Sequence, residues 1–278
     1  MTSNPKRVAL LAMGPSADAY ARHCAVNGER GSLFDETWTV NAFGSIFQVD
    51  RTFHMDDIRI QKIRADAGNA QIKTLLNWLR TAPGPIYTSN PLPKEPNPRL
   101  EEVEGLIRAL AEVDGEDKFD RLYRELEILK AERALQDEGG YKGLVAFPIE
   151  DVLNSTGGPL YFNSTPAYAI AYAMHLKVEA LACFGMDYAS TEKYRGERGR
   201  ACVEYWLGRA VSLGTSILLP RETWLMDANR TESARAYGYD VIDIHVEKDD
   251  EGKALVTFPI KSNLPTAAEV EESYRHDK

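Results

Sequence analysis

The sequence predicts an α/β protein built on an open, mostly parallel β-sheet, with helices on both faces and a helical insertion. Short apolar runs of strand character alternate with segments of helical character along most of the chain, which is the order that produces parallel sheets. Residues 178–184 form a mostly apolar run, as expected of a strand buried on both faces. Residues 167–176 are apolar or aromatic nearly all round, which predicts a buried helix just before that strand.

Composition limits the class of protein and its partners. The 278 residues suffice for one large α/β domain, and 44% hydrophobic with 27% charged residues is ordinary for a globular protein. The net charge of −9 argues against general nucleic-acid binding. No apolar leader or membrane-length run is present, so we expect a cytoplasmic protein without a membrane span. The three cysteines lack C-x-x-C spacing, so neither a disulfide framework nor a zinc site is predicted.

The chain opens with a strand, a tight turn and a helix. Residues 6–13 form a compact apolar run, Gly14, Pro15 and Ser16 form the turn, and residues 17–26 have helical character. Such a turn leaves backbone N–H groups unpaired at a helix N-terminus, a natural seat for a phosphate or carboxylate. Alternatively, Ser16 only caps the helix. The G-x-G-x-x-G and G-x-x-x-x-G-K-[ST] motifs are both absent from the sequence.

The next two predicted strands end in polar side chains. Residues 37–40 precede Asn41, whose amide could contact a base edge or a ribose hydroxyl, or could close a turn on its own backbone. Residues 52–54 end in His54, which either closes the strand or serves catalysis. Both residues would lie at the carboxyl ends of their strands, where ligands bind in open α/β sheets.

Two adjacent carboxylates, Asp56 and Asp57, follow the third strand. Neighbouring carboxylates could bind Mg²⁺ through their oxygens. One of them could instead cap the helix that begins at residue 58, and for one of the two this is the safer interpretation.

The middle of the chain changes character. Residues 89–98 are proline-rich and extended, and residues 100–139 are strongly charged with apolar residues at helical spacing. This pattern predicts a pair of helices that form an insertion or lid over the sheet rim, at about 98–140, with the charge runs as solvated faces. We expect a main domain at 1–240 and a small C-terminal extension at 241–278. The other expected elements are helices at 70–80, 148–153 and 200–213, strands at 86–88, 144–147 and 216–219, a short helix or turn at 223–227, and a strand pair after 239.

The stretch 163–188 joins the buried helix to the buried strand. Ser164 or Thr165 can cap the helix, with Pro166 in its first turn. The strand ends in Gly-Met-Asp-Tyr, so we expect Asp187 and Tyr188 at the sheet rim. A right-handed crossover can bring both ends of the stretch to one rim, beside the turn that follows the first strand.

Four cations then lie close together in an otherwise acidic chain. They could clamp a phosphate or diphosphate, or they could form an exposed loop paired with the acidic surface. The four are Lys193, Arg195, Arg198 and Arg200.

Several of these motifs together resemble one superfamily. Its members include the family 42 bacterial sialyltransferases, and the archaeal 6-hydroxymethylpterin diphosphokinase with its motility-accessory relatives. The shared order is the Gly-Pro-Ser turn after a strand, a strand ending in Asn41, an Asn-Ser-Thr helix start at 163–165, and a strand ending in Gly-x-Asp-Tyr. Short phage-encoded members are also similar. The resemblance covers the N-terminal part and about residues 160–220, but not the insertion or the C-terminal tail.

The resemblance implies a Rossmann-like nucleotide site. In that site the glycine-containing turn would lie by the phosphates, the asparagine would contact the nucleotide, the helix start would hold ribose or phosphate, and the last strand end would shape the pocket. The residues at these positions are Gly14, Pro15, Ser16, Asn41, Asn163, Ser164, Thr165, Asp187 and Tyr188.

Two departures from the pattern bear on activity. Ala12 stands where the family's first glycine is usual, so the backbone would approach a ligand less closely. The catalytic histidine of the sialyltransferases follows their Gly-x-Asp segment, and no histidine occurs here between His175 and His245. The second departure weakens sialyl transfer specifically, and not the nucleotide site.

We expect a nucleotide-dependent group transferase, and the relatives slightly favour glycosyl transfer. Such an enzyme would take a nucleotide-sugar, for example a CMP-type donor, and a hydroxyl-bearing acceptor. An acid/base group would deprotonate that hydroxyl. The candidates are Glu197, Glu204 and His54, with Asp187 at the rim.

Two alternatives stay open. A diphosphokinase-like enzyme would use ATP and Mg²⁺, with Asp56, Asp57 or Asp187 as metal ligands and cations such as Arg200 neutralising the transferring group. The chain could also be a non-catalytic nucleotide- or sugar-binding module, which the altered glycine motif and missing histidine would fit. Either kind of protein could form a homo-oligomer.

Overall fold

The computed structural model describes residues 4–28, 33–110, 119–188 and 193–228, with shorter stretches at 242, 245–260, 264 and 266–273. The chain divides into two compact units, Met1–Met226 and Asp227–Lys278. The boundary expected near residue 240 lies outside the described residues. Each unit is considered by itself below.

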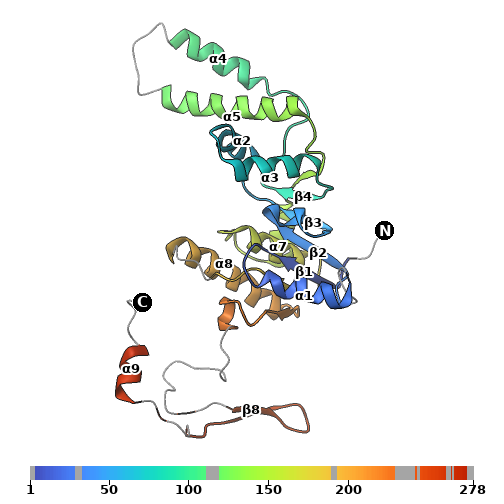
Figure 1. Cartoon of the computed structure of the whole chain (residues 1–278), viewed down its shortest axis with the longest axis vertical. Helices are drawn as coiled ribbons and strands as arrows, with labels where there is room; N and C mark the ends of the chain where they lie inside the picture. Colours follow the sequence, from blue (N-terminus) through green and yellow to red (C-terminus); the bar gives the residue numbers. More distant parts are fainter. Residues whose placement is uncertain are drawn as a thin grey trace. The chain divides into compact units, whose positions relative to one another are not determined.

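The first unit is built on a seven-stranded parallel sheet (Figure 1). The order of its strands is β5-β4-β3-β2-β1-β6-β7, and each neighbouring pair is parallel. The expected α/β class with an open parallel sheet is therefore confirmed. The strands are β1 (Arg7–Leu11), β2 (Glu36–Val40), β3 (Arg51–Phe53), β4 (Ile86–Thr88), β5 (Leu144–Ala146), β6 (Ala180–Phe184) and β7 (Ser216–Leu218).

The strand order contains one reversal of direction. The chain adds β2 to β5 successively on one side of β1, and then returns to place β6 on the other side of β1. In β1 and β6, Leu11 pairs with Phe184, so both strands end at the same level. A reversal of this kind leaves a crevice outside the carboxyl ends of the two strands, where ligands bind in open α/β sheets.

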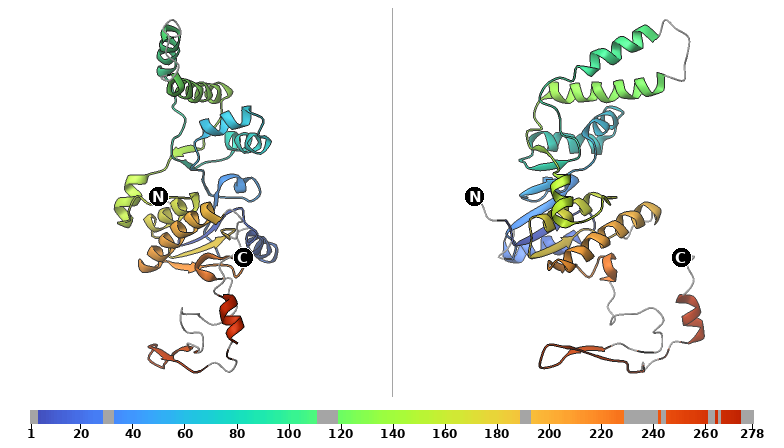
Figure 2. Two further views of the ribbon diagram at one scale, coloured as in Figure 1. Left: turned by 90° about the vertical axis from the view of Figure 1, so that its left-hand side faces the viewer. Right: turned by 180° about the vertical axis from the view of Figure 1, so that it is seen from behind.

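Helices cover both faces of the sheet, as expected (Figure 2). Successive side chains of a strand point to opposite faces. Accordingly, Val8 and Leu10 of β1 lie in one core with α7 and α8, while Ala9 and Leu11 lie in another with Tyr20 of α1. The helices of this unit are α1 (Ala17–Asn27), α2 (Ile58–Asp66), α3 (Ala70–Thr81), α4 (Arg99–Leu110), α5 (Phe119–Glu138), α6 (Ile149–Thr156), α7 (Thr165–His175) and α8 (Lys193–Ser212), with 3₁₀ turns η1 (Asn41–Ser45) and η3 (Leu225–Asp227).

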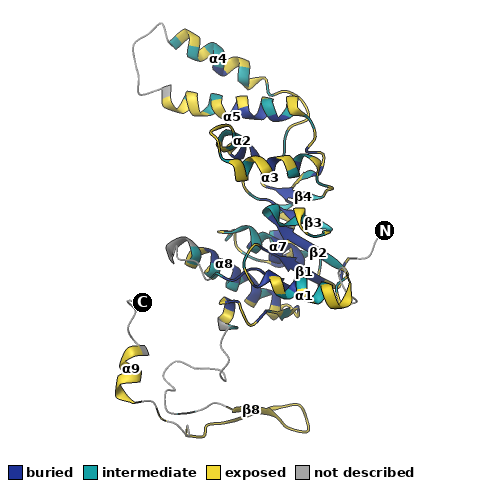
Figure 3. Ribbon diagram, viewed as in Figure 1, coloured by how far each residue is buried: buried dark blue, intermediate teal, exposed yellow. Residues whose placement is uncertain are grey.

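The central strands and α7 form the most deeply buried layer (Figure 3). Four of the five residues of β1 and of β6 are buried, which explains their nearly continuous apolar sequence. In α7, seven of eleven residues are buried, so the all-round apolar helix is placed as its composition predicts. None of the described helices is long and apolar enough to cross a membrane.

The insertion between β4 and β5 is the helix pair α4 and α5, which pack against each other. An ion pair of buried side chains, Arg59 on α2 and Glu132 on α5, fixes the insertion to the sheet domain. Glu132 is therefore an exception to the expected solvated charge runs. The helices extend from the β4–β5 side of the sheet, away from β1 and β6 (Figure 2). The expected helical insertion is therefore confirmed, and its described residues do not form a lid over the rim at β1 and β6.

The second unit contains a small antiparallel strand pair, which confirms the expectation for the C-terminal segment. Its strands are β8 (His245–Lys248) and β9 (Ala254–Thr257), joined by a turn in which the Asp249 side chain accepts from the backbone N–H groups of Glu251 and Lys253. A short helix, α9 (Ala267–Ser273), follows. All residues of the two strands are exposed (Figure 3).

Candidate functional site

Three segments that are far apart in the sequence meet at the carboxyl ends of β1 and β6. The N–H of Gly14, after β1, donates to the carbonyl of Gly185, after β6, at 2.8 Å. The N–H of Gly185 donates in return to the Ser16 hydroxyl at 2.7 Å. The Tyr188 hydroxyl donates to Ser164, at the start of α7, at 3.4 Å. The expectation that both ends of the stretch 163–188 join the first turn at one rim is therefore correct.

Asp187 lies at the centre of this junction. The residue is 6% exposed, and its Oδ2 accepts a hydrogen bond of 2.8 Å from the Ser16 N–H. Gly14 must lack a side chain here, because a Cβ would come within 3.0 Å of the Asp187 Cγ, closer still to Oδ2, and within 2.7 Å of the Gly185 carbonyl. The second carboxylate oxygen, Oδ1, is buried and has no hydrogen-bond partner among the described residues.

The turn after β1 has no unpaired backbone donor between residues 14 and 19. Gly14 N–H donates to Gly185 and Ser16 N–H to Asp187, and Pro15 has no N–H. The N–H groups of residues 17, 18 and 19 donate to the carbonyls of residues 14, 15 and 16. The turn therefore offers no free amide to a phosphate. Of the phosphate or carboxylate expected there, it is the Asp187 carboxylate that occupies the positive end of α1.

Ser16 also differs from its expected role as a helix cap. It stands at the N-cap position of α1, but its hydroxyl makes no capping hydrogen bond to the helix. The hydroxyl instead accepts from the Gly185 N–H, so that it ties the end of β1 to the end of β6.

Tyr188 is held in an unusual backbone conformation beside the start of α7. Its φ of 52° lies in the left-handed region, which a tyrosine adopts only when its surroundings enforce it. Gly199 of α8 allows the close packing, because a Cβ there would lie 3.0 Å from the tyrosine ring. Burial raises the pKa of Tyr188 to about 12, so the hydroxyl stays protonated and donates to Ser164. Asn163 lies next to this contact, with its N–H on the Cys202 sulfur at 3.2 Å.

Asn41 and His54 form a second polar pair at the ends of β2 and β3. Asn41 also has a left-handed φ, of 54°, and its Oδ1 lies 3.2 Å from His54 Nδ1. An amide oxygen only accepts, so Nδ1 carries the proton and Nε2 keeps a lone pair. Nε2 is buried and has no partner in the described part of the chain. Burial lowers the pKa of His54, against the opposing effect of the Asp56 carboxylate.

Thr88, at the end of β4, extends this row and was missed in the sequence. Its side chain is fully buried, and its hydroxyl likewise lacks a partner within the described ranges. The position of Thr88 at the end of a predicted strand could have marked it. Its strand, β4, lies beside β3, as does β2, the strand that precedes Asn41. A threonine in a strand is, however, too common to attract notice by itself.

The two acidic residues after β3 have different surroundings. Asp57 is the N-cap of α2: its carboxylate accepts from the Arg59 N–H at 2.9 Å and pairs with the Arg59 guanidinium at 3.2 Å. The capping interpretation is thus confirmed for Asp57. Asp56 is exposed. Across the described residues, no group of three or more His, Cys, Asp or Glu side chains is arranged to hold a metal ion.

Among the charged residues of α8, some form ion pairs and others are exposed. Arg200 pairs with Glu204 at 2.8 Å, and Glu204 also accepts from the Met226 N–H at 2.7 Å. Glu197 and Arg198 are exposed. The side chains of Lys193 and Arg195 lie outside the described residues, so the predicted four-cation clamp is described only for its second half.

The loop after β7 holds the backbone of residues 186 and 187 by hydrogen bonds, which the sequence did not predict. The buried Thr223 donates from its hydroxyl to the Met186 carbonyl at 2.7 Å, and the Trp224 N–H donates to the Asp187 carbonyl at 3.1 Å. The backbone on both sides of the Asp187 side chain is therefore fixed by neighbouring strands and loops.

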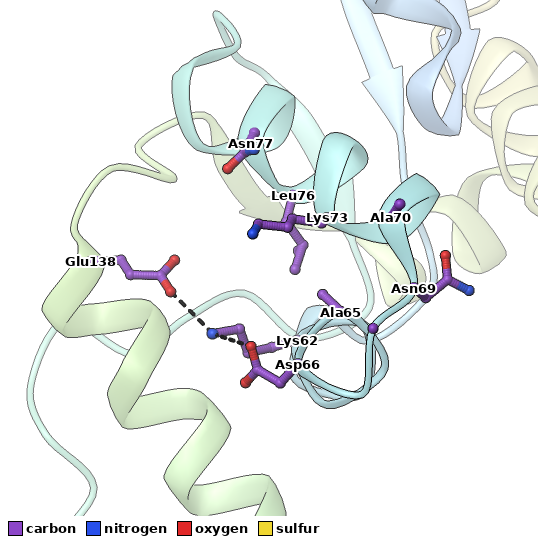
Figure 4. Close-up of a pocket in the computed structure, with 10 residues that line it drawn as sticks. Lys62, Ala65, Asp66, Asn69, Ala70, Lys73, Leu76, Asn77 and Glu138 are labelled. Carbon is purple, nitrogen blue, oxygen red and sulfur yellow. Dashed lines mark hydrogen bonds and ion pairs between the residues drawn. The ribbon is translucent and has the colours of Figure 1, made fainter.

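A separate hollow of about 510 Å³ lies between α2, α3 and α5 (Figure 4). Lys62 and Lys73 both line it, and Lys62 pairs with Asp66 at 2.7 Å and with Glu138 at 3.1 Å. None of the residues predicted for the site lines this hollow, so we do not regard it as the main site.

The fold and this geometry define the class of protein: a Rossmann-like α/β protein with a candidate small-molecule site at the reversal point of its sheet. Comparisons of the chain with protein-family models, with curated proteins and with solved structures give no match.

Proposed function

We propose that this protein is a nucleotide-dependent group transferase of glycosyltransferase type, with its donor nucleotide bound at the carboxyl ends of β1 and β6. One observation carries the proposal. Three distant segments meet at the reversal point of the sheet, and a buried carboxylate there uses only one of its two oxygens. The motif order that resembles nucleotide-sugar transferases falls on these same segments.

The donor phosphate would bind at the start of α7 and not at the turn after β1. The Asp187 carboxylate neutralises the end of α1 and would repel a second anion there. The start of α7 offers the hydroxyls of Ser164 and Thr165 and the positive end of an eleven-residue helix. The protonated Tyr188 hydroxyl donates to Ser164, which leaves the Ser164 hydroxyl proton available for the phosphate.

His54 is our candidate for the base that deprotonates the acceptor hydroxyl. Asn41 fixes the tautomer of its ring, and its unpaired Nε2 is an acceptor at the carboxyl end of β3. Glu204 suits this role less well, because it is shared between Arg200 and the Met226 N–H. Transfer would then move the sugar from the donor phosphate to the acceptor oxygen, with the proton of the acceptor on His54.

The arrangement of oxygen ligands favours transfer without Mg²⁺. A diphosphokinase would need carboxylates gathered around the metal, whereas Asp57 is engaged by Arg59 and the described residues hold no group of three or more His, Cys, Asp or Glu arranged for a metal ion. A glycosyl donor that leaves as a nucleoside monophosphate places less charge on the site than ATP does.

Isothermal titration tests the proposal directly. CMP, CTP, UDP-sugars and ATP are titrated with and without Mg²⁺, and release of nucleotide from the bound donor is then measured with hydroxyl acceptors. We expect one nucleotide to bind without Mg²⁺, and Ser164→Ala to weaken its binding. The matched control, Ser212→Ala on the exposed side of α8, should bind normally.

Each other outcome points elsewhere. Binding of ATP that requires Mg²⁺ would favour the diphosphokinase alternative. Binding without any transfer would favour the non-catalytic module. The absence of binding by every nucleotide would overturn the proposed function.

A further inference from the structure

The unused oxygen of Asp187 requires an explanation of its own. Polar atoms buried in proteins almost always have a hydrogen-bond partner, and an ionised oxygen without one is costly. Asp187 is 94% buried (6% exposed), and its Oδ1 has no partner among the described residues. A hydrogen-bond donor from outside these residues would complete it.

The position of the carboxylate cannot adjust to find another partner. Its Oδ2 is held by the Ser16 N–H, its own carbonyl accepts from Trp224, and the Met186 carbonyl before it accepts from Thr223. The missing Cβ of Gly14 lets the carboxylate lie directly against the turn after β1. Oδ1 is therefore a fixed acceptor at the point where the sheet order reverses.

The chemistry of a fixed carboxylate selects its partner. It repels phosphate, and it forms a short, charge-assisted hydrogen bond with a hydroxyl donor. In a nucleotide, the ribose hydroxyls are donors of this kind, and the amino groups of cytosine and adenine are others. We infer that Asp187 Oδ1 accepts a hydrogen bond from a ribose hydroxyl, so that the site distinguishes ribonucleotides from deoxyribonucleotides. This inference rests on the proposed nucleotide site and adds to it the position and selectivity of the ribose.

A cycle of one substitution and three ligands tests it. CMP, 2′-deoxy-CMP and 3′-deoxy-CMP are titrated against the full chain and against Asp187→Asn. In the unaltered protein, one deoxy ligand should bind about tenfold to a hundredfold more weakly than CMP, as expected for loss of a hydrogen bond to a charged group. In Asp187→Asn, CMP should weaken and the ratio between CMP and that deoxy ligand should approach one.

Asparagine suits this test because its side-chain oxygen can still accept from the Ser16 N–H, while its NH₂ group replaces the acceptor at Oδ1. Thermal unfolding of the variant checks that the fold is retained. Should it fail to fold, 2′-fluoro and 3′-fluoro CMP on the unaltered protein give the same information, because fluorine cannot donate.

The outcomes distinguish a failure of the ribose inference from a failure of the proposed nucleotide site. Equal binding of ribo and both deoxy ligands by the unaltered protein would overturn the inference and leave the nucleotide site standing. An equal loss of all three ligands in Asp187→Asn would show that Asp187 only shapes the site, and would also overturn it. If CMP does not bind but ATP does, the same cycle is run with AMP and its deoxy forms. If no nucleotide binds, the proposed function itself fails.

Discussion

Replacing Gly14 by alanine should destabilise the first unit strongly, for a reason that lies in one contact. The added Cβ would sit 2.7 Å from the Gly185 carbonyl oxygen and 3.0 Å from the Asp187 Cγ. Neither group is free to retreat, because the Gly185 carbonyl is bound by the Gly14 N–H and the carboxylate by the Ser16 N–H. The destabilisation therefore comes from a steric clash between the added Cβ and two groups that hydrogen bonds hold in place.

The size of the effect follows from two contributions. Overpacking a rigid site costs about 1–3 kcal/mol. Displacing a carboxylate from its hydrogen bond adds about 1.5–3 kcal/mol. Their sum, roughly 2.5–6 kcal/mol, corresponds to a fall in Tm of roughly 5–24 °C for a unit of this size.

Urea unfolding followed by tryptophan fluorescence measures this loss in the relevant unit. All four tryptophans lie before residue 227, and Trp38 and Trp206 are fully buried. The control is Gly208→Ala in the interior of α8, where no atom lies within 4 Å of the added Cβ. That variant should be more stable by about 0.5–1 kcal/mol. A Gly14→Ala protein within about 0.5 kcal/mol of the unaltered chain would refute the reasoning.

Three further predictions concern other parts of the first unit. Arg59→Ala should cost about 3–5 kcal/mol in urea unfolding, because it leaves Glu132 buried without its partner; the exposed Arg99→Ala serves as control and should lose no measurable stability. Thr223→Val should cost about 1–3 kcal/mol by leaving the Met186 carbonyl without its donor. The control Thr74→Val, at an exposed position of α3, should change stability by no more than about 0.5 kcal/mol. Burial lowers the pKa of His54 below its value of 6.5 in the unfolded chain. Below pH 6.5 the unfolded state therefore takes up a proton that the folded state does not. As a result, the free energy of unfolding falls by up to about 1.4 kcal/mol for each pH unit of acidification. Urea titrations at pH 7.5, 6.5 and 5.5 should show this slope, and His54→Gln should reduce it; an unchanged slope in the variant would contradict the assignment.

The elements that the sequence predicts best are those whose surroundings are uniform. Strands β1 and β6 and helix α7 are buried nearly all round, and an apolar run suffices to locate them. The insertion shows the limit of such patterns. Its apolar spacing predicts helices, but not that Glu132 is buried against Arg59, because the partner lies 73 residues away on another helix.

The positions of the candidate residues at strand ends were predicted more reliably than the contacts they make. Placement at strand ends identified Asp187, Tyr188, Ser16 and Asn41 from the sequence. That Asp187 occupies the end of α1 depends on the pairing of β1 with β6, across 171 residues, and no local pattern encodes it. The left-handed backbone of Tyr188 is likewise imposed by packing, since tyrosine has no preference for it.

The position of β1 between β2 and β6 also bears on biosynthesis. Strand β1 is synthesised before both strands that it pairs with, and one of its two edges stays unpaired until residues 180–184 have been made. Until then, the start of α1 also lacks the carboxylate that holds it. Contacts of such long sequence separation form slowly and leave strand edges exposed to aggregation. We therefore expect chains truncated before Asp187 to be insoluble, and the nascent chain to complete its sheet only after most of the first unit has been synthesised.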